Sequence, residues 1–427
     1  MAINGTGMYM MNNEDCRENR ENMRERLILV GAALGTQEAC DASLSELEEL
    51  CNTAGADCVG RLIQSRERFS PATYIGKGKL EELKAMILGL AADGIVCDDE
   101  LSPAQLKNLN DMLSCKVLDR TLLILDIFAE RASTSEGKLQ VELAQLRYRA
   151  SRLTGLGTSL SRQGGGIGTR GPGEKQLEVD RRVIHQRIGV LKEELLKVAK
   201  NRAVQRSKRK NGELPLAAIV GYTNAGKSTL LNELTGADIY AQNQLFATLD
   251  PTTRKLLLPN KQEILLTDTV GFIHKLPHHL IEAFRSTLEE AKYADIIIHV
   301  VDSASPDAEL HMQVVYDTLK ELHIMDKPVI TVFNKADLKE ADRMLKDCKA
   351  ECQIYLSAKT GQGFDALFHA MQEMLLMDSI YIEKTLPFAK ASLLARVRRE
   401  GQLIKEEYRE NGIYVEAYIP RKLLAFM

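Results

Sequence analysis

Gly221-Tyr222-Thr223-Asn224-Ala225-Gly226-Lys227-Ser228 has the pattern G-x-x-x-x-G-K-S and directly follows an apolar run, Leu216-Ala217-Ala218-Ile219-Val220. A strand, a glycine turn and the start of a helix form the context that a phosphate-binding loop requires. The glycines let backbone N–H groups surround phosphate oxygens, and the helix N-terminus adds partial positive charge. We expect Lys227 to reach the β- and γ-phosphates and the Ser228 hydroxyl to ligate Mg²⁺. The alternative is a chance match on an ordinary strand-to-helix turn.

A second motif predicts the base of the nucleotide. Asn334-Lys335-Ala336-Asp337 ends the apolar run from Pro328 to Phe333. The Asp337 carboxylate can accept hydrogen bonds from guanine N1–H and the exocyclic amine, whereas adenine offers neither donor there. Sites built on such pairing discriminate by roughly 10⁴-fold or more. We expect Asn334 to tie the base to the phosphate loop and the Lys335 stem to cover one face of the ring.

Two further motifs follow the expected order. Ser357-Ala358-Lys359 comes after the next predicted strand, where a backbone N–H can contact guanine O6. Asp268-Thr269-Val270-Gly271 closes a strand that spans Glu263 to Thr267. This D-x-x-G motif places Asp268 near Mg²⁺ through a water molecule and the Gly271 N–H at the γ-phosphate. Because that contact exists only before hydrolysis, the loop after it is a predicted switch.

The first switch is predicted between these motifs, in Phe246-Ala247-Thr248-Leu249-Asp250-Pro251-Thr252-Thr253-Arg254. One threonine of this segment should complete the Mg²⁺ coordination with its hydroxyl. Spacing alone does not choose among Thr248, Thr252 and Thr253. The order of all the motifs predicts a GTP-binding domain.

The residue after Gly271 predicts slow chemistry. Many GTPases have a glutamine there that orients the attacking water, but this chain has Phe272, which has no hydrogen-bonding group. Unassisted hydrolysis should therefore run at or below about 10⁻⁴ per second. We expect a partner to raise the rate at least about tenfold.

Composition bounds the class of protein. A chain of 427 residues suggests two to four domains, and 44% apolar and 27% charged residues are ordinary for a globular protein. The sequence has no apolar run near 18 residues, and its first 25 residues lack a signal-peptide core. We interpret these first residues as a mobile tail. The eight cysteines form no C-x-x-C pair; Cys348 and Cys352 are expected to be neighbours on a helix face, with reduced thiols rather than a metal.

Charge is unevenly distributed. The segment from Lys138 to Lys210 has 18 Lys and Arg against 6 Asp and Glu, a net of +12, although the whole chain has a net charge of −3. A strongly basic block in an otherwise acidic chain predicts a polyanionic partner. The alternative is a solvated helix pair with no specific partner.

The basic segment has two helical patterns. Leu139, Leu143, Leu146, Ala150 and Leu153 recur at steps of four and three, and so do most of Leu177, Ile184, Ile188, Leu191, Leu195 and Val198. Such narrow stripes predict an antiparallel hairpin of two helices, each of about 20 residues and about 30 Å. Arginines such as Arg147, Arg149, Arg181 and Arg182 should lie off the seam.

The predicted tip of this hairpin is rich in glycine, from Gly155 to Gly173. Gly166 to Gly171 matches G-x-G-x-x-G, but a helix precedes it where a dinucleotide site needs a strand. A flexible linker is one interpretation. RNA contact is the other, because small residues allow close approach and cations neutralise phosphates. The candidate RNA-contacting residues are Arg162, Gln163, Thr169, Arg170 and Lys175.

The two flanks predict α/β structure. Before the hairpin, strands are expected at 27–30, 58–64, 95–97 and 117–118, and helices at 43–53, 79–90, 104–113 and 122–130. This alternation indicates a mainly parallel sheet. Asp98-Asp99-Glu100 forms an acidic end to one strand. Our default interpretation is a helix-capping turn, and the alternative is a metal site. At the other end, a helix around 389–399 and a strand at 413–419 predict a small appendage.

The resulting fold class is α/β multidomain. We predict a polar tail at 1–25, an N-terminal α/β domain at 26–132 and a basic helical hairpin at 133–212. A P-loop GTPase domain follows at 213–378, with a mainly parallel sheet and flanking helices, and an α/β appendage at 379–427.

These motifs resemble those of the HflX-type GTPases, relatives of the Obg family, and the resemblance extends from about Arg26 to Pro420. It implies Thr248 as the Mg²⁺ threonine, because the F-A-T-L-D pattern of the family matches Phe246 to Asp250. The family also has a hydrophobic residue at the position of Phe272. The resemblance implies that the protein binds the large ribosomal subunit and uses GTP to split stalled or stressed ribosomes. It also implies that the N-terminal domain and the hairpin tip lie against ribosomal RNA.

The predicted site follows from motifs and resemblance together. Lys227, Thr248 and Gly271 are the catalytic candidates, and Ser228, Thr248 and, through water, Asp268 are the Mg²⁺ candidates. The nucleotide-binding residues are Gly221, Tyr222, Thr223, Asn224, Ala225, Gly226, Lys227, Ser228, Phe246, Ala247, Thr248, Leu249, Asp250, Asp268, Thr269, Val270, Gly271, Asn334, Lys335, Ala336, Asp337, Ser357, Ala358 and Lys359.

Large-subunit RNA is the expected partner, reached through Arg162, Arg170, Lys175 and their neighbours. We expect a cytoplasmic monomer, at most peripheral to a membrane, that binds no DNA. Two other functions fit the same motifs. One is a GTPase of ribosome assembly or RNA modification, and the other is a nucleotide-gated RNA-binding scaffold in which turnover is incidental.

Overall fold

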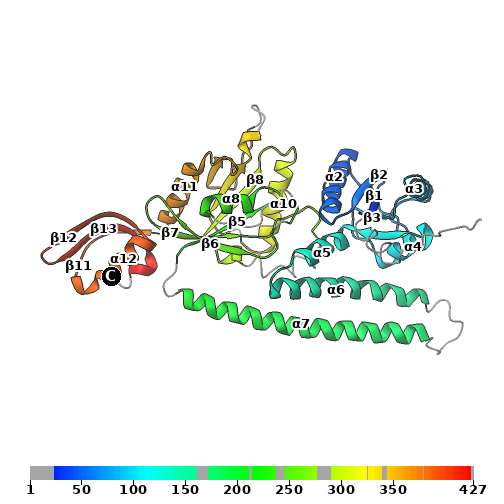
Figure 1. Ribbon diagram of the computed structural model, residues 1–427, viewed down its shortest axis with the longest axis horizontal. Coiled ribbons are helices and arrows are strands. Elements are labelled where there is room, and N and C mark those ends of the chain that lie inside the picture. The colour runs from blue at the N-terminus through cyan, green and yellow to red at the C-terminus, as the bar shows by residue number, and fades with distance from the viewer. Residues whose placement is uncertain are drawn as a thin grey trace, which may run out of the picture. The chain divides into compact units, whose positions relative to one another are not determined.

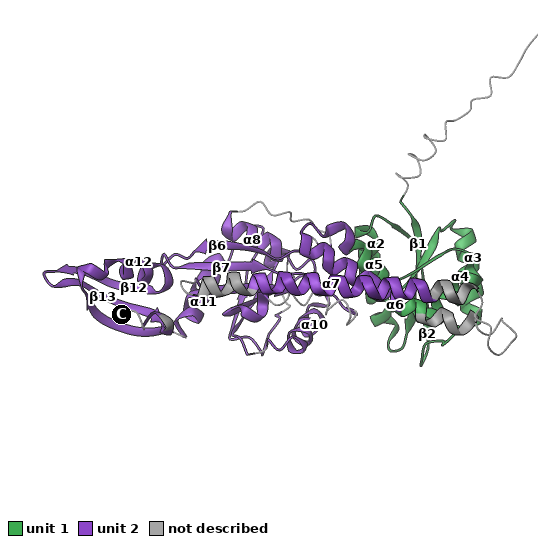
Figure 2. Ribbon diagram, turned by 90° about the horizontal axis from the view of Figure 1, so that it is seen from below, with its two compact units in different colours: residues 1–127, 151–174 green, residues 128–150, 175–427 purple. Residues whose placement is uncertain are grey.

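The computed structural model describes residues 24–160, 172–210, 214–236, 245–246, 248–276, 290–324, 326–338, 344–377 and 379–424, without the side chains of 154–160, 172–177, 203–210 and 422. The predicted tail, apart from residues 24 and 25, lies outside this range. The chain forms two compact units, residues 1–127 with 151–174 and residues 128–150 with 175–427 (Figure 2). The predicted domain boundaries stay a prediction.

The first unit contains a four-stranded parallel sheet in the order β2-β1-β3-β4. Its elements are β1 (Arg26–Ala33), α2 (Gln37–Thr53), β2 (Asp57–Ser65), α3 (Lys77–Gly89), β3 (Gly94–Cys97), α4 (Pro103–Leu113), β4 (Lys116–Asp119) and the start of α5 (Arg120–Arg131). Local chemistry sets the helix ends: Ser102 and Gln105 form a capping box at α4, with Pro103 in the first turn. The expected alternation of strands and helices is confirmed.

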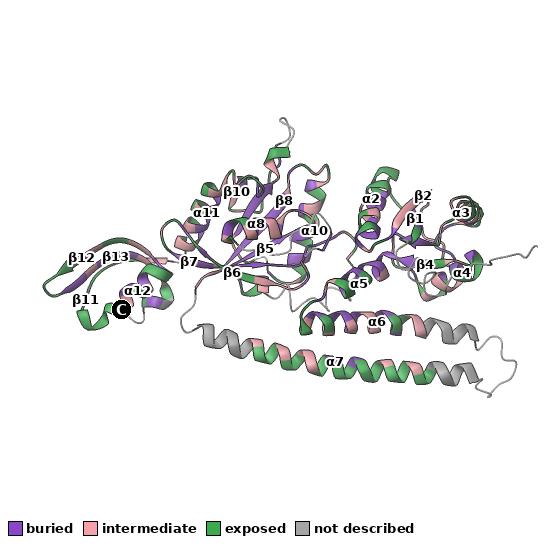
Figure 3. Ribbon diagram, in the orientation of Figure 1, coloured by how far each residue is buried: buried purple, intermediate pink, exposed green. Residues whose placement is uncertain are grey.

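Two long helices follow, α6 (Ser135–Leu160) and α7 (Pro172–Lys210) (Figure 1). They contain 26 and 39 residues, so they are longer than predicted, and α7 spans about 58 Å at 1.5 Å per residue. Pro172 begins α7, where its missing N–H leaves no bond unmade. The predicted seam is present within the second unit, because Leu143, Ala150, Ile188 and Leu191 form a buried cluster. Figure 3 shows that most of the described part of α7 remains exposed.

The second unit also contains a six-stranded sheet in the order β10-β9-β8-β5-β7-β6, in which only β6 is antiparallel to its neighbour. Its strands are β5 (Leu216–Gly221), β6 (Thr252–Leu257), β7 (Glu263–Asp268), β8 (Ile296–Asp302), β9 (Val329–Asn334) and β10 (Cys352–Tyr355). The helical elements are α8 (Lys227–Thr235), α10 (Ala308–Glu321), η1 (Ala336–Leu338) and α11 (Phe364–Met377). Apolar strand residues fill both faces of this sheet, which is why its central strands read as continuous hydrophobic runs.

The chain ends in a three-stranded antiparallel sheet in the order β11-β13-β12. Its elements are β11 (Ser379–Leu386), η2 (Phe388–Lys390), α12 (Ala391–Glu400), β12 (Gln402–Arg409), β13 (Gly412–Pro420) and α13 (Arg421–Leu424). The helix and strand predicted here are present. Strands β11 and β12 were not predicted, because β11 contains a run of three exposed polar residues, 383–385, and β12 has no fully buried residue.

One smaller expectation has a clear outcome. The placement of Cys348 and Cys352 on one helix face was wrong, because Cys352 begins β10 and Cys348 lies in the turn before it. In the described part of the chain, no cluster of His, Cys, Asp or Glu could hold a metal ion, and no helix has the length and apolar character needed to cross a membrane.

Candidate nucleotide site

The phosphate-loop sequence lies between β5 and α8, as its pattern predicts (Figure 1). Its glycines stand where no side chain fits. A Cβ on Gly226, whose φ is +92°, would lie 2.3 Å from Asn334 Nδ2, and one on Gly221 would lie 2.2 Å from the Val300 carbonyl oxygen. The loop is therefore packed against the ends of two neighbouring strands, which fixes its backbone N–H groups before any ligand binds.

Lys227 is buried at the first position of α8. Its Nζ donates to the Tyr222 carbonyl at 2.8 Å. Burial lowers the pKa of Lys227 to about 8, although the Asp268 carboxylate opposes this shift. Gly271 lies close to the Lys227 amine and to the phosphate loop. A Cβ on Gly271 would be 3.0 Å from Lys227 Nζ and 2.8 Å from Thr223 Cα. A bound phosphate would stabilise the positively charged form of Lys227, which burial disfavours.

Three predicted Mg²⁺ candidates meet beside the loop. Ser228 Oγ lies 2.6 Å from Thr248 Oγ1 and donates to Asp268 Oδ2 at 2.7 Å. The second carboxylate oxygen, Asp268 Oδ1, is buried and has no hydrogen-bond partner among the described residues. Burial raises the pKa of Asp268, and the nearby Lys227 opposes that shift. The result is a half-buried cluster of oxygen atoms in which one buried carboxylate oxygen has no hydrogen-bond donor among the described residues.

The other two threonines of the predicted first switch are placed elsewhere. Thr252 begins strand β6, and the Thr253 hydroxyl lies 2.7 Å from the Thr267 hydroxyl. The predicted segment therefore divides at Pro251 into a loop and a strand. Of its loop residues, Phe246 and Leu249 are buried, and Ala247 lies outside the described residues. Asp250 accepts hydrogen bonds from Ser133 and Thr134, which lie outside the phosphate loop.

The second switch begins as a backbone extension of the phosphate loop. Phe272 N donates to Gly221 O at 3.1 Å, and Thr223 N donates to Phe272 O at 2.7 Å. The Phe272 ring is buried in the core beside Ala218 and Val220. It therefore turns away from the phosphate loop, which is a geometric reason to expect slow unassisted hydrolysis in addition to the chemical one. Thr269 and Val270, which directly precede Gly271, are also buried.

The guanine-motif residue Asn334 joins three loops. Its Nδ2 donates to the Ala225 carbonyl of the phosphate loop at 2.8 Å, and its Oδ1 accepts from Ala358 N at 2.9 Å. Asp337 lies on η1, and its exposed side chain can face a base. Ser357 is buried in the loop that follows β10. The fold thus brings all of the described motif residues to one edge of the sheet, the carboxyl ends of β5, β7, β8 and β9.

Three contacts of this site were not predicted. Lys335 has φ of 60° and its Nζ lies 2.7 Å from Asp302 Oδ2 at the end of β8. The Tyr222 ring stacks on His311 at 3.8 Å between centroids, and its hydroxyl accepts from His274 N at 2.7 Å. The sequence could have indicated Asp302 as a site residue, since it is the polar residue that ends an apolar strand. No sequence pattern distinguishes His311, which lies on α10.

Other candidate residues do not join this site. The tip residues Arg162, Gln163, Thr169 and Arg170 lie outside the described residues, and the side chain of Lys175 is not described. In the first unit, Asp98 accepts from Arg120 at 2.8 Å and Asp99 accepts from the Tyr74 hydroxyl at 2.6 Å. The default expectation of a capping turn there was wrong, because Ser102 caps α4 instead.

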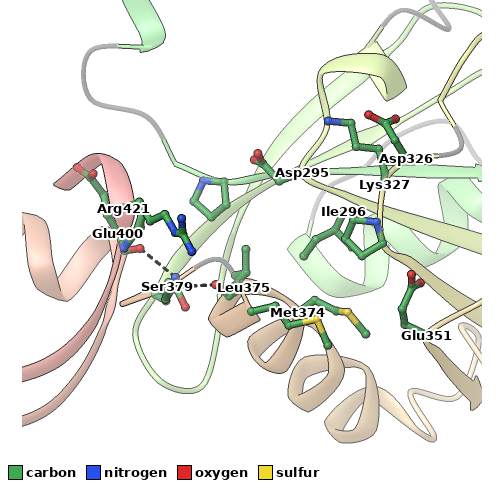
Figure 4. Close-up of a pocket in the computed structure, with 15 residues that line it drawn as sticks. Asp295, Ile296, Asp326, Lys327, Glu351, Met374, Leu375, Ser379, Glu400 and Arg421 are labelled. Atoms are coloured by element: carbon green, nitrogen blue, oxygen red, sulfur yellow. Dashed lines mark hydrogen bonds between the residues drawn. The ribbon is translucent and has the colours of Figure 1, made fainter. Parts of the chain in front are cut away.

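A cavity of about 810 Å³ lies at the opposite edge of the large sheet (Figure 4). Pro215 and Pro328, which precede β5 and β9, line it together with α11 and the appendage residues Glu400 and Arg421. Gln262 Nε2, in the turn before β7, donates to the carbonyl of Glu400 at the end of α12 at 3.0 Å. The cavity is remote from the phosphate loop, because it surrounds the amino ends of the same strands, so the carboxyl edge remains the nucleotide site.

A mainly parallel sheet, a glycine loop before α8 and a guanine motif tied to that loop by Asn334 define a P-loop GTPase. The comparisons with known proteins agree. Residues 41–129 match the family described as GTP-binding GTPase N-terminal, residues 131–209 match GTP-binding GTPase Middle Region, and residues 216–335 match 50S ribosome-binding GTPase.

The chain belongs to the HflX family of GTPases. It is 60% identical over 405 residues to GTPase HflX of Lacrimispora saccharolytica, covering 95% of this chain and 96% of that protein. It is 42% identical to GTPase HflX of Escherichia coli strain K12, covering 88% and 89%. Among solved structures, the SsGBP complex with GDP is 25% identical over 82% of this chain and 98% of that chain, with a TM-score of 0.47. The chain is an enzyme that hydrolyses GTP, as the resemblance implied.

Proposed function

We propose that this GTPase binds the large ribosomal subunit in its GTP-bound form and splits stalled or stressed ribosomes. The observation that carries the proposal is the exposed cationic surface of α7. Arg181, Arg182, Lys192, Lys197 and Lys200 are exposed, whereas the apolar seam toward α6 is closed by packing. The hairpin therefore keeps positive charge free for a polyanion such as ribosomal RNA. The family description of residues 216–335, 50S ribosome-binding GTPase, supports the same partner.

We also propose that Ser228 and Thr248 hold Mg²⁺ and that Asp268 holds it through a water molecule. The oxygen ligands fit this ion, and Asp268 Oδ1 is a buried acceptor in need of a partner. When bound, Mg²⁺ neutralises negative charge on the phosphates of GTP. Lys227 supplies the fixed cation, the Gly271 N–H donates to the γ-phosphate, and Asp337 reads guanine. Each of these residues positions GTP, and none of them activates water.

Slow hydrolysis without a partner follows from this set. Because Phe272 is turned into the core, the group that orients water is supplied by the ribosome or by another part of the protein. GTP orders the two switches through Thr248 and Gly271, the basic hairpin then binds, and hydrolysis releases the factor. The protein acts in this scheme as a cytoplasmic monomer.

Cosedimentation with purified ribosomal subunits tests the proposal. Binding to the large subunit is expected with a non-hydrolysable GTP analogue, and little binding is expected with GDP. Binding should fall steeply with salt, with a log–log slope of roughly −0.7 to −0.9 per phosphate contact. Equal binding with the analogue, with GDP and with no nucleotide would contradict the proposed switch.

Two variants separate the other functions. Lys227→Ala should abolish the nucleotide dependence of binding, whereas a scaffold with incidental turnover would keep its RNA binding. Stronger binding to precursor subunits than to mature subunits would favour an assembly factor.

Arg162→Glu with Arg170→Glu tests the hairpin tip and should weaken ribosome binding while GTP affinity is unchanged. Lys320→Glu with Lys390→Glu is the matched control, because both lysines are exposed outside the hairpin and the charge change is identical. Unchanged binding of the tip variant would show that the tip is only a linker.

A further inference from the structure

The first switch is attached to the start of the hairpin. We call residues 128–137 the arm base and residues 245–246 with 248–250 the switch I loop. The Asp250 carboxylate accepts four hydrogen bonds from two consecutive residues of the arm base. Ser133 donates its N–H at 3.1 Å and its hydroxyl at 2.7 Å to Oδ2, while Thr134 donates its N–H at 2.9 Å to Oδ2 and its hydroxyl at 2.5 Å to Oδ1.

This arrangement uses the N-terminus of α6. Thr134 precedes the helix, and its Oγ1 also accepts from Gly137 N at 2.9 Å, which caps the first turn. Asp250 is thus an anion placed at the positive end of the helix. Hydrogen bonds from N–H and hydroxyl donors to a carboxylate are among the strong ones in proteins, so four of them hold Asp250 firmly at this helix end.

An apolar contact supports the same attachment. The Phe246 ring lies edge-on to Phe128 with centroids 4.6 Å apart, and both rings are almost fully buried. Phe246 has φ of 55°, a conformation that an aromatic residue rarely adopts without support from its surroundings. The switch I loop is consequently fixed to the arm base near both of its ends.

Thr248 lies between these two attachments and points elsewhere. Its hydroxyl is 2.6 Å from Ser228 Oγ, at the proposed Mg²⁺ position. Thr248 and Asp250 are two residues apart, so at most about 7 Å of chain separates their Cα atoms. One short segment therefore joins the nucleotide site to the arm base, and a displacement at either end moves the other.

We propose that Asp250 is a positioning residue, which holds Thr248 at the Mg²⁺ position through Ser133 and Thr134 and so couples the nucleotide state to the arm base. The inference rests on the proposed Mg²⁺ role of Thr248. Coupling between two sites is reciprocal, so an arm base that prefers the attached switch also strengthens GTP binding relative to GDP.

Gly137→Ala is the sharpest test, because it leaves every hydrogen-bonding group in place. An ideal Cβ on Gly137 would lie 2.6 Å from Asp250 Oδ1, so the methyl group displaces the carboxylate. Alanine has a higher helix propensity than glycine, so the substitution does not weaken α6 itself. Gly189→Ala is the matched control, because Gly189 lies in α7 with no atom within 4 Å of its Cβ position.

We expect Gly137→Ala to weaken the affinity for a fluorescent GTP analogue with Mg²⁺ at least fivefold and to raise the Mg²⁺ concentration needed for half-maximal binding. GDP affinity should change less than twofold, and Gly189→Ala should match the wild type throughout. An analogue affinity within twofold of the wild type in Gly137→Ala overturns the proposal.

Thr134→Val and Thr134→Ser form a second pair that decides the question if Gly137→Ala does not fold. Valine keeps the shape but removes the hydroxyl, whereas serine keeps the hydroxyl. Serine should retain the preference for the GTP analogue and valine should lose it. Equal behaviour of the two variants counts against the proposal.

Hydrogen exchange of the wild type gives a readout without substitution. The amides of Ser133 and Thr134 should exchange more slowly with the GTP analogue and Mg²⁺ than with GDP, and equal exchange contradicts the coupling. Thr248→Ala separates the two levels of inference. If it leaves analogue affinity and Mg²⁺ dependence unchanged, the proposed Mg²⁺ role of Thr248 fails. If it weakens them and Gly137→Ala does not, only the attachment fails.

Discussion

The two parallel sheets of this protein share an architecture but treat their carboxyl edges differently. In the GTPase sheet, glycines keep the edge after β5 clear of side chains, and the phosphate loop occupies it. In the N-terminal sheet, the Tyr74 hydroxyl accepts from Ala32 N at the end of β1 and donates to Asp99, and the buried Arg120 bridges Asp98 and Glu46. Open sheets bind ligands at the edge where strand order reverses. One sheet leaves this edge to a substrate, and the other fills it with its own polar side chains. The fold alone therefore does not make a site.

The largest expected effect is that of Lys227→Ala in the GTPase sheet. The variant removes the only strong positive charge that the described phosphate loop and start of α8 direct at the nucleotide. Affinity for GTP should fall at least about a thousandfold, equivalent to about 4 kcal/mol. Isothermal titration measures it, with Lys320→Ala on α10 as a control that should leave affinity unchanged. A loss below tenfold would mean that backbone groups alone hold the phosphates.

Arg120→Met in the N-terminal sheet should change stability without changing GTP binding. The guanidinium is 1% exposed, so its loss leaves Asp98 and Glu46 without their cation. We expect a loss of about 3 kcal/mol from the free energy of unfolding, measured by urea denaturation. Arg120→Met with Asp98→Leu should recover part of it, because the unpaired charge is also removed. If Arg120→Met instead weakens GTP affinity by more than fivefold, the two edges are not independent.

Asp347→Asn tests whether the GTPase sheet also contains a stabilising polar cluster. The buried Asp347 Oδ2 accepts from the Tyr316 and Thr331 hydroxyls, each at 2.6 Å, while His299 Nδ1 is farther away at 3.7 Å. Asparagine can keep only part of this pattern, so we expect a loss of about 2 kcal/mol in urea denaturation at pH 7. Asp326→Asn, at an exposed position, is the control.

The pH dependence of this effect has a definite sign. Burial raises the pKa of Asp347, but His299, Thr331 and Tyr316 together lower it well below its ordinary value of 3.8. Its stabilising contribution is therefore complete at neutral pH and is lost as the pH falls through the folded-state pKa. Burial lowers the pKa of His299, which is neutral at pH 7. The difference between wild type and Asp347→Asn should shrink below about pH 4; a constant difference would exclude the ionised carboxylate as its source.

The smallest expected effect is that of Tyr74→Phe, which removes the hydroxyl between Ala32 N and Asp99. Leaving these two groups without a shared partner should cost about 1 kcal/mol. The ring still fills the edge, so no ligand site should open. Urea denaturation measures the cost. A second nucleotide-binding site in the Tyr74→Phe variant, in addition to the phosphate loop, would contradict the role of Tyr74 in filling this edge.

Much of the fold was predictable because its signals are local. The four N-terminal strands and four helices follow from hydrophobic periodicity, and the helical hairpin follows from its leucine steps. The edge strands β11 and β12 were missed, because exposed polar residues on both faces weaken the period of two. Helix lengths were also underestimated, since α6 continues through Gly155 and Gly157 despite their low helix propensity.

The sequence by itself determined the chemistry of this protein: a nucleotide loop, a guanine motif, a switch without a water-orienting side chain, and a cationic hairpin. The first three are written in fewer than ten consecutive residues each, and the hairpin is written in a repeated helical pattern of apolar residues and in its excess of Lys and Arg. Tertiary structure decided which distant residues meet. Asp302 reaches Lys335, and Asp250 meets Ser133 and Thr134 more than 110 positions earlier. No local pattern encodes such a pair, because the partners are brought together only when the sheet orders its strands and the helix ends take their places.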